Sequence, residues 1–111
     1  MATVYKRLGA IASTGTIGTA DTLYTVPSAT ATVVSTITVC NTSSSAATFT
    51  IAISTTTSFV ASGYLVYQAS IAGNDTVALT LGATLDATNK YLLCSASAST
   101  VSFSAFGSEI S

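Results

Sequence analysis

Charged residues are scarce in this sequence. Three of its 111 residues are Lys or Arg and four are Asp or Glu, together 6% of the chain, where ordinary soluble domains have about 25%. Three basic side chains cannot form the cationic surface that binds a phosphate backbone. We therefore expect no nucleic acid among the partners of this chain.

Histidine is missing altogether. Catalysis near neutral pH needs a group that exchanges protons or attacks a substrate, held by partners that shift its pKa. The four carboxylates, Asp21, Asp75, Asp86 and Glu109, are scattered, and three of them fall in expected turns. No serine stands in a Gly-x-Ser-x-Gly context, and no glycine-rich phosphate loop occurs. We expect no catalytic residue, no metal ligand and no cofactor-binding residue, and hence no enzyme.

Cysteine occurs twice, as Cys40 and Cys94. Both fall in strand-like segments, where two facing sheets could join them in a disulfide. A chain made in a reducing cytosol would instead keep both as small buried thiols, and we expect this second state. Without histidine, neither thiol has the partner that a metal site or a cysteine nucleophile needs.

Long apolar stretches are absent as well. The longest unbroken runs have four residues, Tyr64 to Tyr67 and Tyr91 to Cys94, whereas a membrane span needs about 18. The opening residues lead into Gly, Ala, Ser and Thr rather than into an apolar stretch of signal-peptide length. The sequence predicts neither a membrane segment nor a secretory signal.

Small and hydroxyl-bearing residues take the place of the missing charges. The chain has 21 Thr, 17 Ser and 18 Ala, and its formal net charge is −1. Such a surface is open to two interpretations, a soluble domain that tolerates neutrality or a subunit that spends its life packed against others. Because net charge normally keeps free monomers apart, we favour the packed subunit.

Apolar residues recur with a period of two. Three segments show this most clearly, around Phe49, Val77 and Phe103, where every second residue is Thr, Ser or Ala. Successive side chains of a strand point to opposite faces, so each segment is predicted to place one face in a core. We expect seven residues of these segments to be buried: Phe49, Ile51, Ile53, Val77, Leu79, Val101 and Phe103.

Turn-forming residues divide the chain into about eight strands. The predicted strands are Thr3–Ala12, Thr22–Val26, Thr32–Asn41, Ala46–Ser54, Tyr64–Ala69, Asp75–Leu81, Lys90–Ala96 and Thr100–Ile110. Residues 32–54 are the clearest hairpin, joined by the loop at 41–45. At most one turn of helix is expected, near Leu85–Thr88, and residues 12–21 are expected to be the most flexible. With no helices to support parallel crossovers, the pattern predicts an all-β fold, an antiparallel sandwich of jelly-roll type that forms one domain over residues 1–111.

Five tyrosines remain, Tyr5, Tyr24, Tyr64, Tyr67 and Tyr91. An exposed aromatic cluster would bind a sugar or a protein partner, because these rings combine apolar area with a hydroxyl group. Alternatively the tyrosines lie along strands and fill the rim of the core, and we favour this second arrangement.

Several stretches resemble a family of roughly hundred-residue virion structural proteins of tailed phages that infect cyanobacteria and other aquatic bacteria. The stretches are LYTVPSATATVVSTITVCNTSSSAATFTIAI (Leu23–Ile53), NDTVALTLGATLDATN (Asn74–Asn89), VSFSAFGSEI (Val101–Ile110) and the opening Met1–Gly9. Members of this family are labelled head decoration, tail-fibre or simply structural proteins. The resemblance implies a place in a virion, assembled in the bacterial host cytoplasm, and it carries over no binding residues.

Composition and resemblance together predict a non-enzymatic virion subunit. The first expectation is a capsid-decorating or cement protein that stabilises the head shell. Its partners would be the major capsid protein and further copies of itself, with neither nucleic acid nor membrane involved. A neck, tail or fibre-associated subunit is the second expectation, and a carbohydrate-binding β-sandwich for host attachment is the third.

Overall fold

Alternation of apolar and hydroxyl-bearing residues produces eight strands, which hold 63% of the described residues. The computed structural model describes residues 3–111. The strands are β1 (Thr3–Ala12), β2 (Asp21–Thr25), β3 (Ala31–Asn41), β4 (Ala47–Ser54), β5 (Tyr64–Ile71), β6 (Asp75–Leu85), β7 (Tyr91–Ala96) and β8 (Val101–Ile110). One short 3-10 helix, η1 (Ala61–Gly63), precedes β5. Among these residues there is no α-helix, so the predicted all-β class is confirmed.

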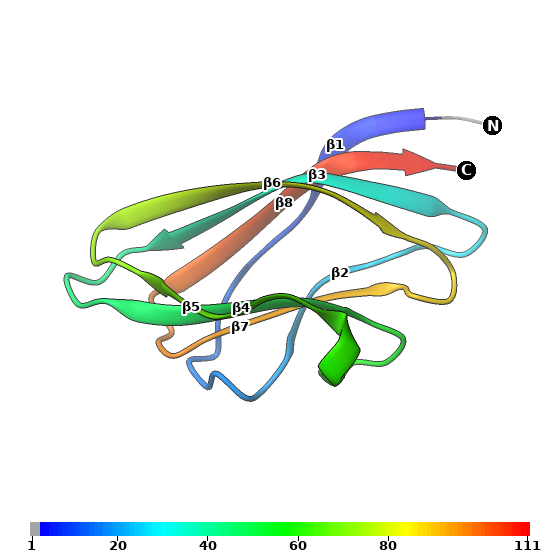
Figure 1. Cartoon of the computed structure of the whole chain (residues 1–111). Coiled ribbons are helices and arrows are strands. Elements are labelled where there is room, and N and C mark those ends of the chain that lie inside the picture. The colour runs from blue at the N-terminus through cyan, green and yellow to red at the C-terminus, as the bar shows by residue number, and fades with distance from the viewer. Residues whose placement is uncertain (1–2) are drawn as a thin grey trace.

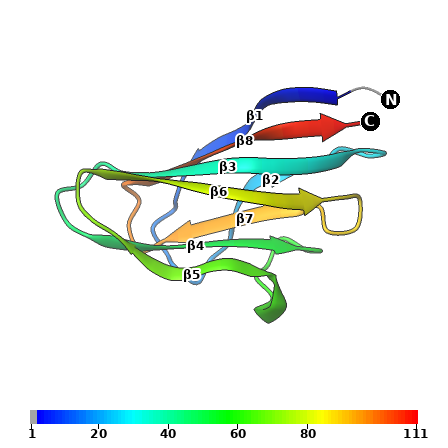
Figure 2. The ribbon, with the colours of Figure 1, turned by 45° about the horizontal axis from the view of Figure 1, so that its top comes forward.

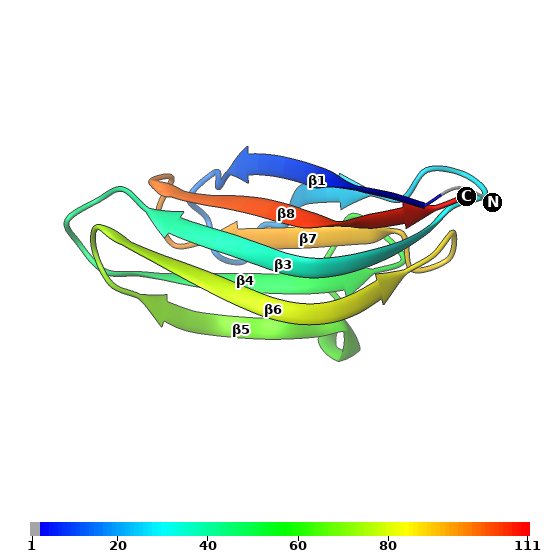
Figure 3. The same ribbon diagram turned by 90° about the horizontal axis from the view of Figure 1, so that it is seen from above.

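The strands form two four-stranded antiparallel sheets that pack face to face (Figure 1). Sheet A has the order β1-β8-β3-β6 and sheet B the order β2-β7-β4-β5. Seen onto sheet A in Figure 3, its four strands follow one another in this order with sheet B behind them. Two interleaved sheets of four strands in this order are the jelly roll, so the predicted architecture is confirmed.

The predicted hairpin over residues 32–54 is wrong. Strand β3 pairs with β6 and β8, whereas β4 pairs with β5 and β7, so the loop between β3 and β4 crosses from one sheet to the other. Asn41 is fully buried and holds this crossing. Its amide nitrogen donates to the Ser45 carbonyl at 2.8 Å, and its amide oxygen accepts from the Ser43 N–H at 3.1 Å. Because this loop is an arch between the sheets, the apolar faces of β3 and β4 lie opposite each other in the core. A hairpin would place both strands in one sheet, with their apolar faces side by side.

The same asparagine also joins two other loops at this end of the sandwich. Its amide nitrogen donates to the Ala72 carbonyl in the β5–β6 loop, and its amide oxygen accepts from the Thr100 hydroxyl in the β7–β8 loop at 3.1 Å. Figure 2 shows all three loops gathered at this end. Asn41 therefore fixes how the two sheets are connected.

Inward-facing residues of both sheets form one apolar core. The Phe49 ring on β4 meets the Phe103 ring on β8 edge to face, with centroids 6.4 Å apart. Four of the seven residues predicted to be buried are at most 2% exposed: Phe49, Ile51, Val101 and Phe103. Strand β8 follows the predicted alternation from Val101 to Gly107, with every odd residue buried.

The other three of those residues are half-buried, which corrects the prediction. Ile53, Val77 and Leu79 do face the core and pack against it. Strand β6 lies at the edge of sheet A, so Val77 and Leu79 lack a neighbouring strand on one side. Ile53 is the second-last residue of β4, near the end of the sandwich. Period two gives the correct face of a strand, and the position of the strand in the sheet decides how deeply that face is buried.

The expected helical turn at residues 85–88 is also misplaced. Leu85 ends β6, and a tight turn follows in which the Asp86 carboxylate accepts hydrogen bonds from the N–H groups of Thr88 (2.9 Å) and Asn89 (2.8 Å). These two bonds hold the pKa of Asp86 below its ordinary value. Within residues 3–111 the single helical turn is η1, which lies on the outer side of sheet B (Figure 1).

A polar cluster joins the two sheets near the ends of the chain. Tyr24 of sheet B is buried, and its hydroxyl donates to the Glu109 carboxylate of sheet A and contacts the Thr32 hydroxyl at 2.9 Å. Glu109 also forms a salt bridge with Lys6 at 3.0 Å. Burial, then the hydrogen bond to Glu109, raises the pKa of Tyr24 to about 12. The bonds from Tyr24 and Lys6 hold the pKa of Glu109 below its ordinary value of 4.5.

Truncation of a core ring should destabilise the fold strongly. Phe49→Ala and Phe103→Ala should each cost about 3–5 kcal/mol of unfolding free energy, because each loses its transfer energy and leaves a cavity. Urea denaturation followed by circular dichroism measures this. Phe106→Ala is the matched control, since Phe106 lies on the same strand but on the outer, half-exposed face, and it should cost less than half as much. Equal losses at Phe103 and Phe106 would contradict the assigned faces of β8.

Acid should weaken the Glu109 cluster. Because the folded pKa of Glu109 lies below its unfolded value, its contribution to stability is complete above about pH 4.5 and is lost as pH falls through the folded pKa. Glu109→Gln should lower stability at pH 7 and flatten the fall in stability below about pH 5. Urea denaturation at stepped pH measures both, with the exposed Asp75→Asn as the control. A variant with an unchanged pH profile would contradict this assignment.

Candidate functional site

The carboxylates that a catalytic or metal site would need are dispersed over the fold. Asp75 begins β6 and Asp86 follows its last residue, so they lie at opposite ends of an 11-residue strand. Asp21 accepts from the Thr14 N–H at 3.1 Å, and Glu109 belongs to the cluster with Tyr24. Among residues 3–111, no group of three or more His, Cys, Asp or Glu side chains is placed to hold a metal ion.

The two cysteines lie in different sheets and are free thiols. Cys94 on β7 is fully buried in the core. Burial raises the pKa of its thiol well above the ordinary value, and the nearby Asp21 carboxylate raises it further. A thiol that stays protonated is a poor nucleophile. Cys40 on β3 pairs with Ser102 and is half-buried on the outer side of sheet A.

Two loops cover the outer face of sheet B, so hydroxyl residues that point outward there are buried. Thr50, Ser54 and Ser95 are at most 2% exposed. The Ser95 hydroxyl donates to the Ile17 carbonyl of the β1–β2 loop at 2.5 Å, and the Ser54 hydroxyl donates to the Ser58 carbonyl of the β4–β5 segment at 2.9 Å. Figure 1 shows both segments, blue and green, on the outer side of the lower sheet.

Residues 12–21, which the sequence predicts to be the most flexible, form several hydrogen bonds. Ser13 donates from its N–H to the Val101 carbonyl at 2.9 Å, and its hydroxyl accepts from the Ala96 N–H at 3.1 Å. At the far end of the loop, the Asp21 carboxylate accepts from Thr14. The loop is therefore tied to strands β7 and β8 and to its own start.

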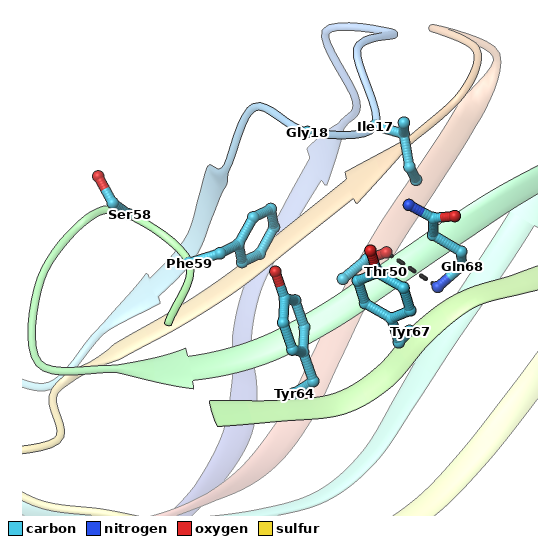
Figure 4. Close-up of a pocket in the computed structure, with 8 residues that line it drawn as sticks. All are labelled: Ile17, Gly18, Thr50, Ser58, Phe59, Tyr64, Tyr67 and Gln68. Carbon is cyan, nitrogen blue, oxygen red and sulfur yellow. Dashed lines mark hydrogen bonds between the residues drawn. The ribbon is translucent and has the colours of Figure 1, made fainter. Parts of the chain in front are cut away.

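A pocket opens between these two loops and strand β5. It is lined by Ile17, Gly18, Thr50, Ser58, Phe59, Tyr64, Tyr67 and Gln68 (Figure 4), and we call it the aromatic pocket. Its volume is about 340 Å³, near the lower end of the roughly 300–1,000 Å³ of small-molecule sites. Three of its eight residues are aromatic, and none is charged.

The three rings form a continuous row. The Tyr64 ring lies 5.6 Å from the Phe59 ring and 4.7 Å from the Tyr67 ring, measured between centroids. Tyr64 and Tyr67 meet edge to face at 71°, a favourable arrangement for aromatic pairs. Tyr67, at the open end of the row, keeps 62% of its surface exposed. A flat ligand can therefore lie against an aromatic side chain without any rearrangement of the core.

Two bulges in β5 shape this row. Phe49 pairs with Ala69 and Ile51 with Val66, so Tyr67 and Gln68 both stand opposite Thr50. Gln68 takes a left-handed backbone conformation with φ of 49°, and its N–H donates to the Thr50 hydroxyl at 3.1 Å. Bulges of this kind re-aim side chains and often lie beside functional sites. A second bulge lies closer to η1: Ile51 pairs with Val66 but Ala52 pairs with Tyr64, so Leu65 is an extra residue. Without this second bulge, Tyr64 and Tyr67, three residues apart, would point to opposite faces of the sheet.

The short helix η1, which precedes β5, packs closely against β4. A Cβ atom on Gly63, the last residue of η1, would lie 2.1 Å from the Ile53 carbonyl oxygen. Only glycine allows the chain to approach β4 this closely. Phe59 precedes this segment, and Figure 4 shows its ring beside that of Tyr64.

The aromatic cluster departs from the arrangement that the sequence favoured for the tyrosines. Tyr24 does fill the core rim, and Tyr91 is half-buried with the Lys90 ammonium 5.3 Å from its ring centroid. Tyr64 and Tyr67 instead share the pocket with Phe59. Three residues apart on a regular strand they would not meet, and the bulge that brings them together depends on pairing with β4. No local signal in the sequence marks it.

The outer face of sheet A differs from that of sheet B in being uncovered. Figure 3 shows no described segment crossing in front of it. Pairing places these residues on this open face: Thr3, Tyr5, Arg7, Ala10 and Ala12 of β1; Ser102, Ser104, Phe106, Ser108 and Ile110 of β8; Ala31, Val33, Thr36, Thr38 and Cys40 of β3; Thr76, Ala78, Thr80 and Thr84 of β6. Arg7 is the one charged residue among them.

Strand β6 forms an edge of this sheet and has an uncharged sequence from Thr76 to Leu85. At the other edge, β1 carries Lys6 and Arg7. Charged residues are a common protection of edge strands against pairing with other chains. Within the described residues, β6 therefore has the less protected edge.

Comparisons with known proteins found no family model and no curated protein that matches this chain. Within residues 3–111, no helix has the length and apolar character needed to cross a membrane.

Proposed function

We propose that this protein is a non-enzymatic structural subunit of a virion, and that it decorates the head shell of a tailed phage. The observation that carries the structural role is the open face of sheet A, which spans four strands and has Arg7 as its single charge. The sequence resemblance to small virion proteins supports the virion as the place of assembly.

The open face suits contact with other subunits because it costs little to desolvate. Hydroxyls of Ser and Thr find hydrogen-bond partners across an interface, whereas an unpaired buried charge would be strongly unfavourable. Four strands about 4.8 Å apart and about 33 Å long give roughly 600 Å² of flat area. Stable interfaces use about 800 Å² from each partner, so a second contact, such as the uncharged edge of β6, would complete the attachment.

Decoration of a shell also fits contacts of this kind. A subunit that bridges two or more capsid proteins through several modest contacts gains attachment by multivalency. The major capsid protein is the proposed partner, together with further copies of this chain. The alternative within the same virion is a neck, tail or fibre-associated subunit, which would use the same open face with fewer copies.

Copy number should separate these two positions. Quantitative mass spectrometry of purified particles should find hundreds of copies of this chain relative to the portal or tail proteins. Antibody labelling seen by electron microscopy should then cover the head. A few tens of copies, with label at the neck or tail, would replace decoration with the alternative. Absence of the chain from purified particles would overturn the virion role itself.

Charge introduced into the open face should prevent attachment. Thr38 and Ser104 are neighbours on β3 and β8 near the middle of this face, and the double variant Thr38→Glu, Ser104→Glu should fold but be depleted at least tenfold from particles when supplied in trans. Ala87→Glu, in the exposed β6–β7 turn, is the control and should be incorporated normally.

The unmodified protein should stay attached in about 1 M NaCl, where screening leaves electrostatics a reach of only about 3 Å. Sedimentation of particles before and after the salt step measures retention. Release by salt alone, or normal incorporation of the double variant, would contradict attachment through the open face.

A further inference from the structure

We propose that the aromatic pocket binds a neutral saccharide. This inference rests on the outer face of sheet B and is independent of the role assigned to sheet A. A sugar ring has one apolar C–H face and a rim of hydroxyl groups, so its recognition needs an aromatic platform with polar groups around it.

The platform is the row of rings formed by Phe59, Tyr64 and Tyr67. Tyr67 has the greatest exposure of the three, 62%, and presents its ring at the mouth of the pocket. The ring centroids lie 4.7 and 5.6 Å apart along the row, so each ring restricts the rotation of its neighbour. Prior ordering of the rings reduces the conformational entropy that binding would otherwise cost.

Polar groups with unused hydrogen-bonding capacity surround the rings. Gln68 contributes its backbone N–H to Thr50, while its side-chain amide has no partner among residues 3–111. The hydroxyls of Tyr64 and Tyr67 likewise have no partner within the described chain. Figure 4 shows the Gln68 amide turned toward Ile17. These groups supply both donors and acceptors, as the mixed hydroxyls of a sugar require.

The chemistry of the lining selects against other ligands. No lining residue is charged, so an anionic or cationic ligand would find no opposite charge. A wholly apolar ligand would cover Thr50, Ser58 and Gln68 without offering hydrogen bonds, which is unfavourable. The left-handed conformation of Gln68, with φ of 49°, belongs to the bulge and places its side chain at the pocket.

The test uses the full chain and a defined set of oligosaccharides. The neutral probes are maltohexaose, cellohexaose, mannohexaose and hexa-N-acetylchitohexaose, and hexagalacturonate is the charged comparison. Saturation-transfer NMR and titration calorimetry should show saturable binding of at least one neutral probe and weaker or no binding of hexagalacturonate. Absence of saturable binding for all four neutral probes at about 10 mM, where any affinity better than about −3 kcal/mol would register, would overturn the proposal.

Variants then locate the site. Tyr67→Ala should weaken binding at least tenfold, because the exposed ring is the platform, while Tyr67→Phe should keep most of the affinity. Tyr5→Ala is the matched control, since Tyr5 is a similarly exposed tyrosine, 68%, on the outer face of the other sheet. Far-UV circular dichroism checks that each variant is folded. Unchanged affinity in Tyr67→Ala, or an equal loss in Tyr5→Ala, would overturn the assignment.

Failure here leaves attachment through sheet A untouched. The glutamate substitutions on the open face should not alter saccharide binding, and the Tyr67 variant should still be incorporated into particles. The two proposals therefore succeed or fail on separate measurements.

Discussion

Apolar packing between the two sheets is the interaction on which every other feature of this protein depends. The Phe49 and Phe103 rings meet at its centre, and the inward residues of β3, β4, β7 and β8 surround them. Because every second residue enters this core, the residues between them must form the two outer faces. In this sequence those residues are mostly Thr, Ser and Ala, so the same alternation that builds the core leaves the outside nearly without charge.

The outer face of sheet B is covered by loops and that of sheet A is open, so the two sides of the molecule differ. On sheet B, the hydroxyls of Ser54 and Ser95 anchor loops that cover the face and leave the aromatic pocket between them. On sheet A none of the described loops intervenes, and a broad surface with Arg7 as its single charged residue remains. One side thus offers a shaped recess for a small ligand, while the other offers a flat area for a protein neighbour. A subunit that attaches by sheet A would turn the pocket away from its support.

The sequence predicted what depends on neighbours along the chain and missed what depends on partners far away. Strand positions and the inward faces around Phe49 and Phe103 follow from period two, which is local. The sheet to which β4 belongs does not, because hairpin and arch have the same loop length, and the buried bonds of Asn41 decide between them. The aromatic pocket was beyond prediction for the same reason, because the bulges at Leu65 and Gln68 exist only in register with β4, a different strand. For the open face, the sequence predicted only that the surface would be rich in Ser, Thr and Ala and poor in charge, and not which sheet would be left uncovered.

The position of β8 has a consequence for how the protein is made. This strand lies between β1 and β3, yet the ribosome releases it after all the other strands. Until it arrives, β1 and β3 have a gap between them and sheet A cannot close, so the core lacks Val101, Phe103 and Ala105. Folding must therefore wait for synthesis of the last strand, and the long-range pairing that follows is of the slow kind. During that interval the nascent chain exposes the unpaired edges of β1 and β3, and β3 carries no charged residue that would protect its edge from pairing with another chain.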